Sequence, residues 1–356
     1  MSTISLKRRL PGYIATGLCI LVTSLWTLWG VVEMFHEGWY RPFEWFFFLL
    51  PVLASLAMTL VALTWPWLGG WLLIAIGGAS YALILWRTAA KVGLTLGGAL
   101  SWFPVSGLFV GVGVLFLAEA RHRREATGPP GRHWWQRNLR YLLAIGIPLL
   151  LGIGLSIEPA IRISSRVDDG YRGQRLIEGN GVTLIWAPAG PGWMTSTSSP
   201  SWNEIALYGV PPVGFEGKRY GRDGQCNKDT AAGCATPAEM QRYNICRYLS
   251  EDGSRLLAEP QGFWRMPTAN ELVRSLVRHG ENAGCTWSGQ VGQAPCQVRP
   301  DKETPLWDPK APVIYYWSAE ERDARSAYKV AYNGGVEALL KFTGLGSCGY
   351  RCVRDR

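Results

Sequence analysis

The chain has 356 residues, of which 48% are hydrophobic and 18 are tryptophan, and its formal net charge is +9 at pH 7. Apolar runs of membrane-spanning length fill the sequence up to about residue 157, and a mixed, moderately charged sequence follows. From residue 141 onward the chain has 24 basic and 22 acidic residues, and a soluble part so close to neutral argues against a nucleic-acid partner.

Five apolar runs are predicted to cross a lipid bilayer, because each approaches the roughly 20 residues that a transmembrane helix needs. They are Tyr13–Val32, Trp45–Thr64, Trp71–Trp86, Leu94–Leu117 and Tyr141–Ile157. The first run is too long for a signal peptide and lacks a small-residue cleavage site, so we expect it to be retained. No run contains a charged residue, and a channel or transporter function therefore has no support.

The distribution of lysine and arginine predicts the orientation of these spans. Nine basic residues lie before the first run and in the loop Glu119–Arg140, whereas the loops on the other side carry Arg41, Arg87 and Lys91. Because cytoplasmic loops are enriched in Lys and Arg, we expect a cytoplasmic N-terminus, and five spans then place the C-terminal part outside. The prediction is a multi-pass protein of the bacterial inner cell membrane, with the lipid bilayer as one partner.

After the last run, residues 158–180 are predicted to form a polar connector and residues 181–356 a globular domain. A helix is predicted over Glu239–Ser250, because Thr236 and Pro237 supply an N-cap and a first-turn proline. Strands are predicted where β-branched and aromatic residues gather, at Val182–Trp186, Val313–Trp317, Tyr328–Tyr332 and Gly349–Val353.

A Trp-Arg-Met-Pro-Thr run opens a second predicted helix. Pro267 fixes its own φ angle, Thr268 supplies the N-cap, and Glu271 completes a capping box three residues later. Trp264 is expected to be buried, and Arg265 is expected to bind carbonyls or a carboxylate. The capping chemistry favours a structural role for this segment.

The same run resembles the R-L-P-T…E element of the sulfatase-modifying-factor family, which includes the formylglycine-generating enzymes. It is still more similar to the W-R-L-P-T…E-L of a related group of bacterial surface domains, whose Y-W-S strand resembles Tyr315–Ser318. The C-terminus is similar to the G-F-R-C and V-R-C-V-R termini of the two groups through Gly349, Tyr350, Arg351 and Cys352. The resemblance starts near residue 181 and implies a C-type-lectin-like α+β fold, in which two helices flank small antiparallel sheets.

Seven of the eight cysteines follow the last apolar run, which suits an oxidising compartment. The resembling fold implies a disulfide between Cys246 and Cys352, which joins the first helix to the last strand. Two further pairs are predicted because each closes a short loop, Cys226–Cys234 and Cys285–Cys296. Cys348 then lies outside the three pairs.

Catalysis in the resembling family depends on copper, which two thiolates spaced C-x4-C hold just before the terminal motif. Thiolates are soft ligands that suit Cu(I). The corresponding stretch of this chain, from Tyr328 to Gly346, contains no cysteine, and Cys352 matches a structural cysteine of the family. Because Cys348 alone cannot supply two ligands, we expect no copper site.

Calcium and zinc have equally little support in the sequence. The acidic residues Asp301, Glu303 and Asp308 lack the spacing of an EF-hand, and the sugar-binding motifs of C-type lectins are absent. His279 is the only histidine after the last run, which is too few for a zinc site. No cofactor is therefore predicted, with copper or calcium as the alternatives.

Two tryptophans in Gly- and Pro-containing segments, Trp287 and Trp307, are candidates for a ligand platform, although filling the core is the favoured interpretation. We expect a membrane-anchored recognition or sensing protein of the cell surface, with a non-catalytic head that binds an extracellular protein or glycan. The alternative is an oxidoreductase of the formylglycine-generating type, displayed outside the membrane.

Overall fold

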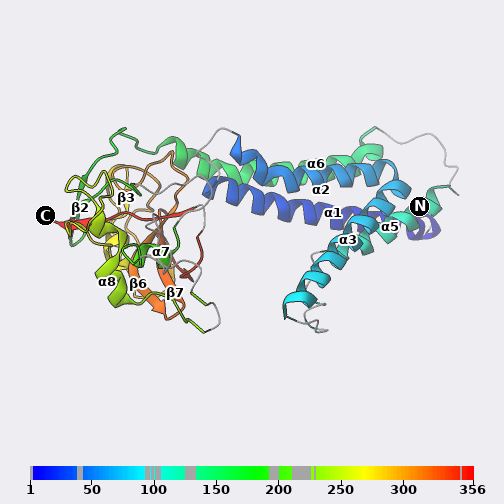
Figure 1. Ribbon diagram of the computed structural model, residues 1–356. Helices are drawn as coiled ribbons and strands as arrows, with labels where there is room; N and C mark the ends of the chain where they lie inside the picture. Colours follow the sequence, from blue (N-terminus) through cyan, green and yellow to red (C-terminus); the bar gives the residue numbers. More distant parts are fainter. Residues whose placement is uncertain are drawn as a thin grey trace. The chain divides into compact units, whose positions relative to one another are not determined.

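The computed structural model describes residues 3–37, 43–92, 97, 100, 106–124, 134–191, 200–210, 226–227, 230–344 and 347–356. The chain divides into two compact units, a helical one over Met1–Ala160 and a sheet-containing one over Ile161–Arg356 (Figure 1). We call the first the membrane unit and the second the head.

The described helices of the membrane unit are α1 (Thr3–His36), α2 (Glu44–Thr64), α3 (Pro66–Val92), α5 (Leu108–Arg124) and most of α6 (Trp134–Ser164). Four helices in the described part of the chain are long and apolar enough to cross a membrane, over Leu10–His36, Glu44–Thr64, Pro66–Arg87 and Asn138–Ser164. They contain the first, second, third and fifth spans that the sequence predicts.

The predicted fourth span, Leu94–Leu117, is not among these four, so the prediction of five spans is not matched within the described residues. Most of its first half lies outside the described residues, and its second half belongs to α5. The 17 residues of α5 end in a basic turn. Such a helix is about 26 Å long, which is less than the roughly 30 Å thickness of a hydrocarbon core.

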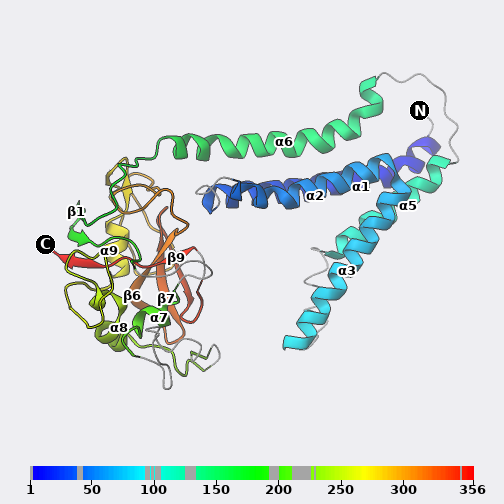
Figure 2. The same cartoon turned by 45° about the horizontal axis from the view of Figure 1, so that its top comes forward.

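Small residues allow the helices of the membrane unit to approach closely. A Cβ atom added at Gly113 of α5 would lie 2.6 Å from the carbonyl oxygen of Gly70 in α3, and one added at Gly69 would lie 2.2 Å from the Cα atom of Ala62 in α2. Helices α3 and α5 accordingly run side by side (Figure 2). Such contacts are typical of helix packing in lipid, where dispersion forces replace the hydrophobic effect.

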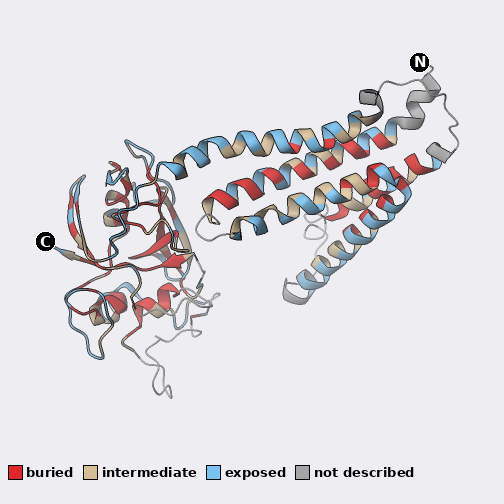
Figure 3. Ribbon diagram, turned by 90° about the horizontal axis from the view of Figure 1, so that it is seen from above, coloured by how far each residue is buried: buried red, intermediate tan, exposed pale blue. Residues whose placement is uncertain are grey.

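Exposed residues lie along these helices, as the pale blue parts of Figure 3 show, and many of them are large and apolar. Leu150 of α6 is 71% exposed and Phe47 of α2 is 66% exposed. Large apolar surfaces of this kind are rare on soluble proteins and indicate contact with lipid.

The described part of the head contains three sheets. In the first, β1 (Arg175–Gly179), β2 (Val182–Trp186) and β10 (Val353–Asp355) are antiparallel in the order β1-β2-β10. The second pairs β3 (Val277–Arg278) with β4 (Glu281–Asn282). The third has the order β5-β8-β7-β6-β9, with bounds β5 (Gly292–Gln293), β6 (Tyr315–Asp323), β7 (Ser326–Ala331), β8 (Gly335–Leu340) and β9 (Cys348–Gly349). Strand β9 is parallel to β6, and the other pairs are antiparallel.

Short helices connect these sheets, namely α7 (Trp202–Ala206), α8 (Pro237–Tyr243), the 3-10 helix η2 (Ile245–Tyr248) and α9 (Ala269–Arg274). A capping box opens each of the three α-helices, and the predicted one at Thr268 and Glu271 is among them. The predicted helix Glu239–Ser250 is shorter than expected. Asn244 ends it, because its side chain donates to the Met240 carbonyl and accepts from the Cys246 amide.

The head begins earlier in the chain than the sequence predicts. Strand β1 lies inside the expected connector 158–180 and pairs with β2 along its whole length. Buried and exposed residues alternate only weakly along β1, because Ile177 is its one buried residue. This pattern explains why the strand was not predicted, because an edge strand of this kind has little hydrophobic periodicity.

Tryptophan fills much of the core of the head. The fully buried side chains include Trp186, Trp202, Trp264, Trp307 and Trp317. Several of their indole N–H groups bond to backbone carbonyls, as Trp264 does with Ser250 at 2.9 Å and Trp317 with Pro200 at 3.0 Å. Buried indoles usually find such acceptors.

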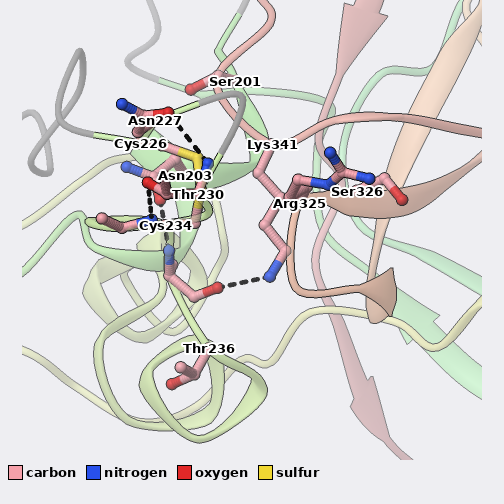
Figure 4. Close-up of a disulfide and its surroundings, with 12 residues drawn as sticks. Ser201, Asn203, Cys226, Asn227, Thr230, Cys234, Thr236, Arg325, Ser326 and Lys341 are labelled. Carbon is pink, nitrogen blue, oxygen red and sulfur yellow. Dashed lines mark hydrogen bonds between the residues drawn. A yellow bond between two sulfur atoms is a disulfide. The ribbon is translucent and has the colours of Figure 1, made fainter.

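Three cysteine pairs lie at disulfide distance, and they are the pairs that the sequence analysis expects: Cys226–Cys234, Cys246–Cys352 and Cys285–Cys296. The second joins η2 to the residue before β10, at a sequence separation of 106. Figure 4 shows the first pair beside Lys341, whose ammonium group donates to the Ala235 carbonyl at 2.7 Å. Lys341 also forms an ion pair with Glu321 of β6, so its ammonium group connects the loop at Ala235 to the large sheet.

Candidate functional site

A cavity of about 460 Å³ lies in the head. This volume is within the range of small-molecule sites. Five segments line it: the start of the head at Tyr171 and Arg172, the loop 188–191 after β2, Pro200 before α7, the loop 304–313 together with Tyr316 of β6, and residues 348–351 at β9. Segments that are far apart in sequence therefore converge on one space.

An apolar wall forms one part of the cavity. The rings of Trp307 and Tyr316 are stacked, with centroids 4.0 Å apart and an interplanar angle of 9°. Burial raises the pKa of Tyr316 to about 12, so its hydroxyl stays neutral at physiological pH. Five prolines also contribute to the lining: Pro188, Pro191, Pro200, Pro305 and Pro312. Because proline has no N–H group, this wall offers few hydrogen-bond donors.

A second part of the cavity lining carries opposite charges that offset one another. Arg172 forms ion pairs with Asp168 at 2.8 Å and with Asp308 at 2.9 Å. Burial opposes ionisation of Asp168, but the hydrogen bonds from Arg172 and from the Gly170 amide lower its pKa below the usual value. The arginine side chain is 37% exposed, so these pairs are partly solvated and contribute little to stability.

Arg351 supplies a third, buried charge to the lining. Its guanidinium group donates to the carbonyl oxygens of Ala187 at 2.7 Å, of Pro305 at 2.9 Å and of Leu306. Within the part of the chain that the structure describes, no carboxylate forms an ion pair with it. Burial lowers the pKa of Arg351 to about 10. The cations Arg175 and Arg172 act in the same direction as burial, and Tyr316 acts in the opposite direction.

Three of the terminal motif residues that the sequence singles out meet at this cavity. A Cβ atom added at Gly349 would lie 2.8 Å from the Cγ1 atom of Val313, so only glycine fits there. The Tyr350 hydroxyl donates to the Pro191 carbonyl at 2.7 Å, and Arg351 completes the run. The buried side chain of Cys348 precedes them and also lines the cavity.

The Trp-Arg-Met-Pro-Thr motif lies elsewhere and connects α9 to the last strand. The backbone of Arg265 exchanges two hydrogen bonds of 2.9 Å with Val353. Its guanidinium group binds both oxygens of Glu271, at 2.8 and 2.7 Å, and one oxygen of Asp355 at 2.9 Å. Burial opposes ionisation of Glu271, but the hydrogen bonds from Arg265 and from the Thr268 amide lower its pKa.

The two candidate platform residues are separated in the structure. Trp307 is 2% exposed and belongs to the cavity wall. Trp287 is half-buried, packs edge-on against Tyr328 at 5.2 Å and donates to the Gln290 carbonyl, and it is not part of the cavity lining. The structure therefore does not bring them together into one surface.

Several lining residues were missed at the sequence level, above all Tyr171 and Arg172 in the expected connector. The sequence does hold one signal for the site, which is the proline density of the two segments 188–191 and 304–312. Such prolines rigidify loops, and rigid loops commonly carry binding sites.

Among the described residues, no three side chains of His, Cys, Asp or Glu gather in the manner of a metal site. Comparison with protein-family models, with curated proteins and with solved structures finds no match to this chain.

Proposed function

We propose that the protein is a membrane-anchored recognition or sensing protein of the cell surface, and that its head is a non-catalytic domain resembling the sulfatase-modifying-factor type. The cavity of the head is its ligand site. One observation carries this proposal: the residues that line the cavity are bonded directly to the segment that continues α6 into the head.

The first step of this connection is a buried ion cluster at the end of α6. The side chains of Asp301 and Glu303 are fully buried. Arg162, in the last turn of α6, and Arg166 lie 3.2 and 2.7 Å from the Asp301 carboxylate, and Arg278 lies 3.3 Å from that of Glu303. Removing one member of such a cluster leaves buried charges without compensation.

The second step leads from this cluster to the cavity. The Val167 amide donates to the Glu303 carboxylate at 2.8 Å, and the Thr304 amide donates to the Val167 carbonyl at 3.1 Å. Thr304 and Pro305 then line the cavity. A ligand that shifts these two residues acts on the cluster and on the last turn of α6. Contiguity supports such coupling, and a measurement of coupling must establish it.

The proposed location of the head is outside the cytoplasm, in a bacterial inner membrane. The three cysteine pairs support an oxidising compartment, and the excess of basic residues near the N-terminus and in the loop Glu119–Arg140 supports a cytoplasmic N-terminus. This arrangement requires a fifth crossing by the segment that includes α5. A reporter fused after Arg356 that is active only in the cytoplasm would contradict it.

A second candidate function is an oxidoreductase of the formylglycine-generating type, which the cysteine in the cavity wall favours. In that case the Cys348 thiolate would be essential. Purified protein in detergent would take up Cu(I) stoichiometrically and oxidise a cysteine-containing peptide, and Cys348→Ser would abolish both. Under the recognition proposal, neither uptake nor oxidation is detected.

Site-specific photo-crosslinking in living cells tests the proposal itself. A photoreactive residue replaces Ala311, which lines the cavity, and in a control protein it replaces the exposed Arg322 of β6. We expect a discrete mass adduct at position 311 and none at position 322, and we expect the adduct to persist with Cys348→Ser. Equal yields at both positions, or no adduct at 311, would contradict ligand recognition by the cavity.

A further inference from the structure

The buried charges of the head differ in whether they have a counter-ion. Lys329 lies 3.1 Å from the Glu337 carboxylate, and Lys341 is paired with Glu321. Arg351 is equally buried, yet its guanidinium group meets only three carbonyl oxygens in the described part of the chain. Carbonyl dipoles satisfy hydrogen bonds but carry no net charge. A buried cation is costly unless an anion compensates it.

The other charged groups around Arg351 offset one another, because Arg172 is paired with Asp168 and Asp308. The charged lining residues of the cavity are Arg172, Arg351 and Asp308, and their formal sum is +1. Arg175 and Arg172 are the charged side chains that act on Arg351 electrostatically, and both are cations. Arg175 is paired with Asp169 as Arg172 is with its two aspartates, so an anionic group placed in the cavity would be attracted mainly by Arg351.

The aromatic and proline residues of the lining select an apolar body for the ligand. The stacked rings of Trp307 and Tyr316 and the five prolines present an aromatic and aliphatic surface. The buried indole N–H group of Trp307 has no acceptor among the described residues. The described lining residues include no side-chain amide, and the carboxylate of Asp308 is paired with Arg172, so a polar sugar acid would lose hydrogen bonds there.

We infer that the cavity binds a small organic carboxylate with an aromatic or apolar body, with its anionic group at Arg351 and its body against Trp307 and Tyr316. This inference rests on the proposed function and names the chemical class of the ligand. The volume of about 460 Å³ suits a small molecule and not a folded protein.

Binding to the full chain in detergent micelles, measured by calorimetry at pH 7, tests the inference. The probes are 3-phenylpropanoate, its neutral amide 3-phenylpropanamide, and glucuronate as a polar anion. We expect the carboxylate to bind at least about tenfold more tightly than the amide, as one charge-assisted hydrogen bond provides. Glucuronate should bind more weakly than 3-phenylpropanoate. Equal affinities for acid and amide, tighter binding of glucuronate, or no binding of any probe would overturn the inference.

Three variants locate the charge effect. Arg351→Gln should abolish the preference for acid over amide, Arg351→Lys should retain part of it, and the exposed control Arg322→Gln should leave it unchanged. A preference that survives in a folded Arg351→Gln protein would overturn the assignment. The three carbonyl bonds of Arg351 also hold the fold, so the folding of each variant is checked by thermal unfolding.

A measurement on the unaltered protein keeps the inference testable if Arg351→Gln does not fold. A diazirine derivative of 3-phenylpropanoate should label peptides that contain Trp307 or Tyr316, and excess 3-phenylpropanoate should suppress this labelling. Labelling confined to other peptides would overturn the inference. If crosslinks form at position 311 in cells while the acid shows no preference, recognition stands and the ligand class is wrong.

Discussion

The membrane unit and the head bury their polar groups by different means. In the membrane unit, hydroxyl groups bond back to their own helix, as Thr16 does to the Gly12 carbonyl at 2.6 Å and Thr27 to the Thr23 carbonyl at 2.8 Å. In the head, buried charges pair across segments that are distant in sequence, and Asp301 meets Arg166 over 135 residues. The membrane unit has contacts between helices as well, such as the hydroxyl pair of Thr23 and Ser55 and the ion pair of Arg140 and Glu119, but the clustered buried charges at Asp301 belong to the head.

This difference predicts that the two units respond to different perturbations. Helices in lipid keep their backbone hydrogen bonds when a tertiary contact is lost. A small domain with long-range charge pairs and disulfides loses its fold as one cooperative unit. Changes to the head should therefore leave the helical content of the membrane unit intact, and changes at helix contacts should leave the head intact.

The largest effect is expected from Asp301→Asn. The substitution removes the carboxylate that Arg162, Arg166 and Arg278 share, and breaking a buried ion pair typically costs about 3–5 kcal/mol of unfolding free energy. Urea unfolding of the head in micelles measures it. The matched control is Asp355→Asn, because the side chain of Asp355 is 80% exposed. This variant should change the unfolding free energy by less than about 1 kcal/mol. Equal losses for the two variants would show that the cluster is not structural.

The next effect is expected from loss of the disulfide between Cys246 and Cys352. It closes a loop of 106 residues, and removing a native disulfide typically costs about 2–5 kcal/mol. The double serine variant should lower the urea midpoint of the head without changing the helical signal of the membrane unit. The disulfide between Cys226 and Cys234 closes a loop of only 8 residues. Replacing both of these cysteines by serine should therefore lower the unfolding free energy less. A larger loss for the short loop would contradict this order.

A pH effect follows from Lys302. Its pKa is lowered from 10.5 to about 7, mainly because the ammonium group is buried. The positive charge of Arg166 also lowers this pKa, whereas Asp308 and Asp301 act in the opposite direction. Between these values the unfolded chain binds more protons than the folded one, so stability rises as pH increases from 7 towards 10.5.

Between pH 7 and 9 the gain is at most about 2–3 kcal/mol, because each pH unit contributes no more than about 1.4 kcal/mol per group. Urea midpoints of the head at the two pH values give the slope. Lys302→Met should remove it, while Lys310→Met, at a side chain that is 80% exposed, should keep it. A slope that survives Lys302→Met would assign the effect to another group.

The smallest effect is expected in the membrane unit, from Gly113→Ala. The added methyl group would lie 2.6 Å from the Gly70 carbonyl oxygen and should separate α3 from α5, at a cost of about 1–3 kcal/mol. Gly111→Ala, in the same helix, meets nothing within 4 Å and should be neutral or stabilising. Thermal loss of the helical signal measures both. Equal behaviour of the two variants would mean that close helix contact does not stabilise this unit.

Local features of the fold could be predicted from the sequence. The capping box at Thr268 and Glu271 depends only on residues three positions apart, and β2 coincides with the predicted Val182–Trp186 because its core-facing residues alternate. The helix before Ser250 was predicted too long, since its end depends on two bonds of the Asn244 side chain.

The candidate site could be predicted only in part. Gly349, Tyr350, Arg351 and Trp307 were singled out, the first three through a resemblance that remains a proposal. The convergence of the connector on the loop 304–313 could not be predicted, because it depends on Glu303 and Thr304 meeting Val167 across more than 130 residues. Periodicity carries no information on such contacts.

Hydrogen–deuterium exchange on the full chain in lipid nanodiscs tests most directly whether the cavity and the end of α6 are coupled. The Val167 amide bonds to Glu303, and the Asp169 amide bonds to the Thr304 hydroxyl. We expect saturating 3-phenylpropanoate to slow exchange in the peptide that covers residues 165–172 as well as in the cavity loop 304–313. Slower exchange in the cavity loop alone, with residues 165–172 unchanged, would contradict it.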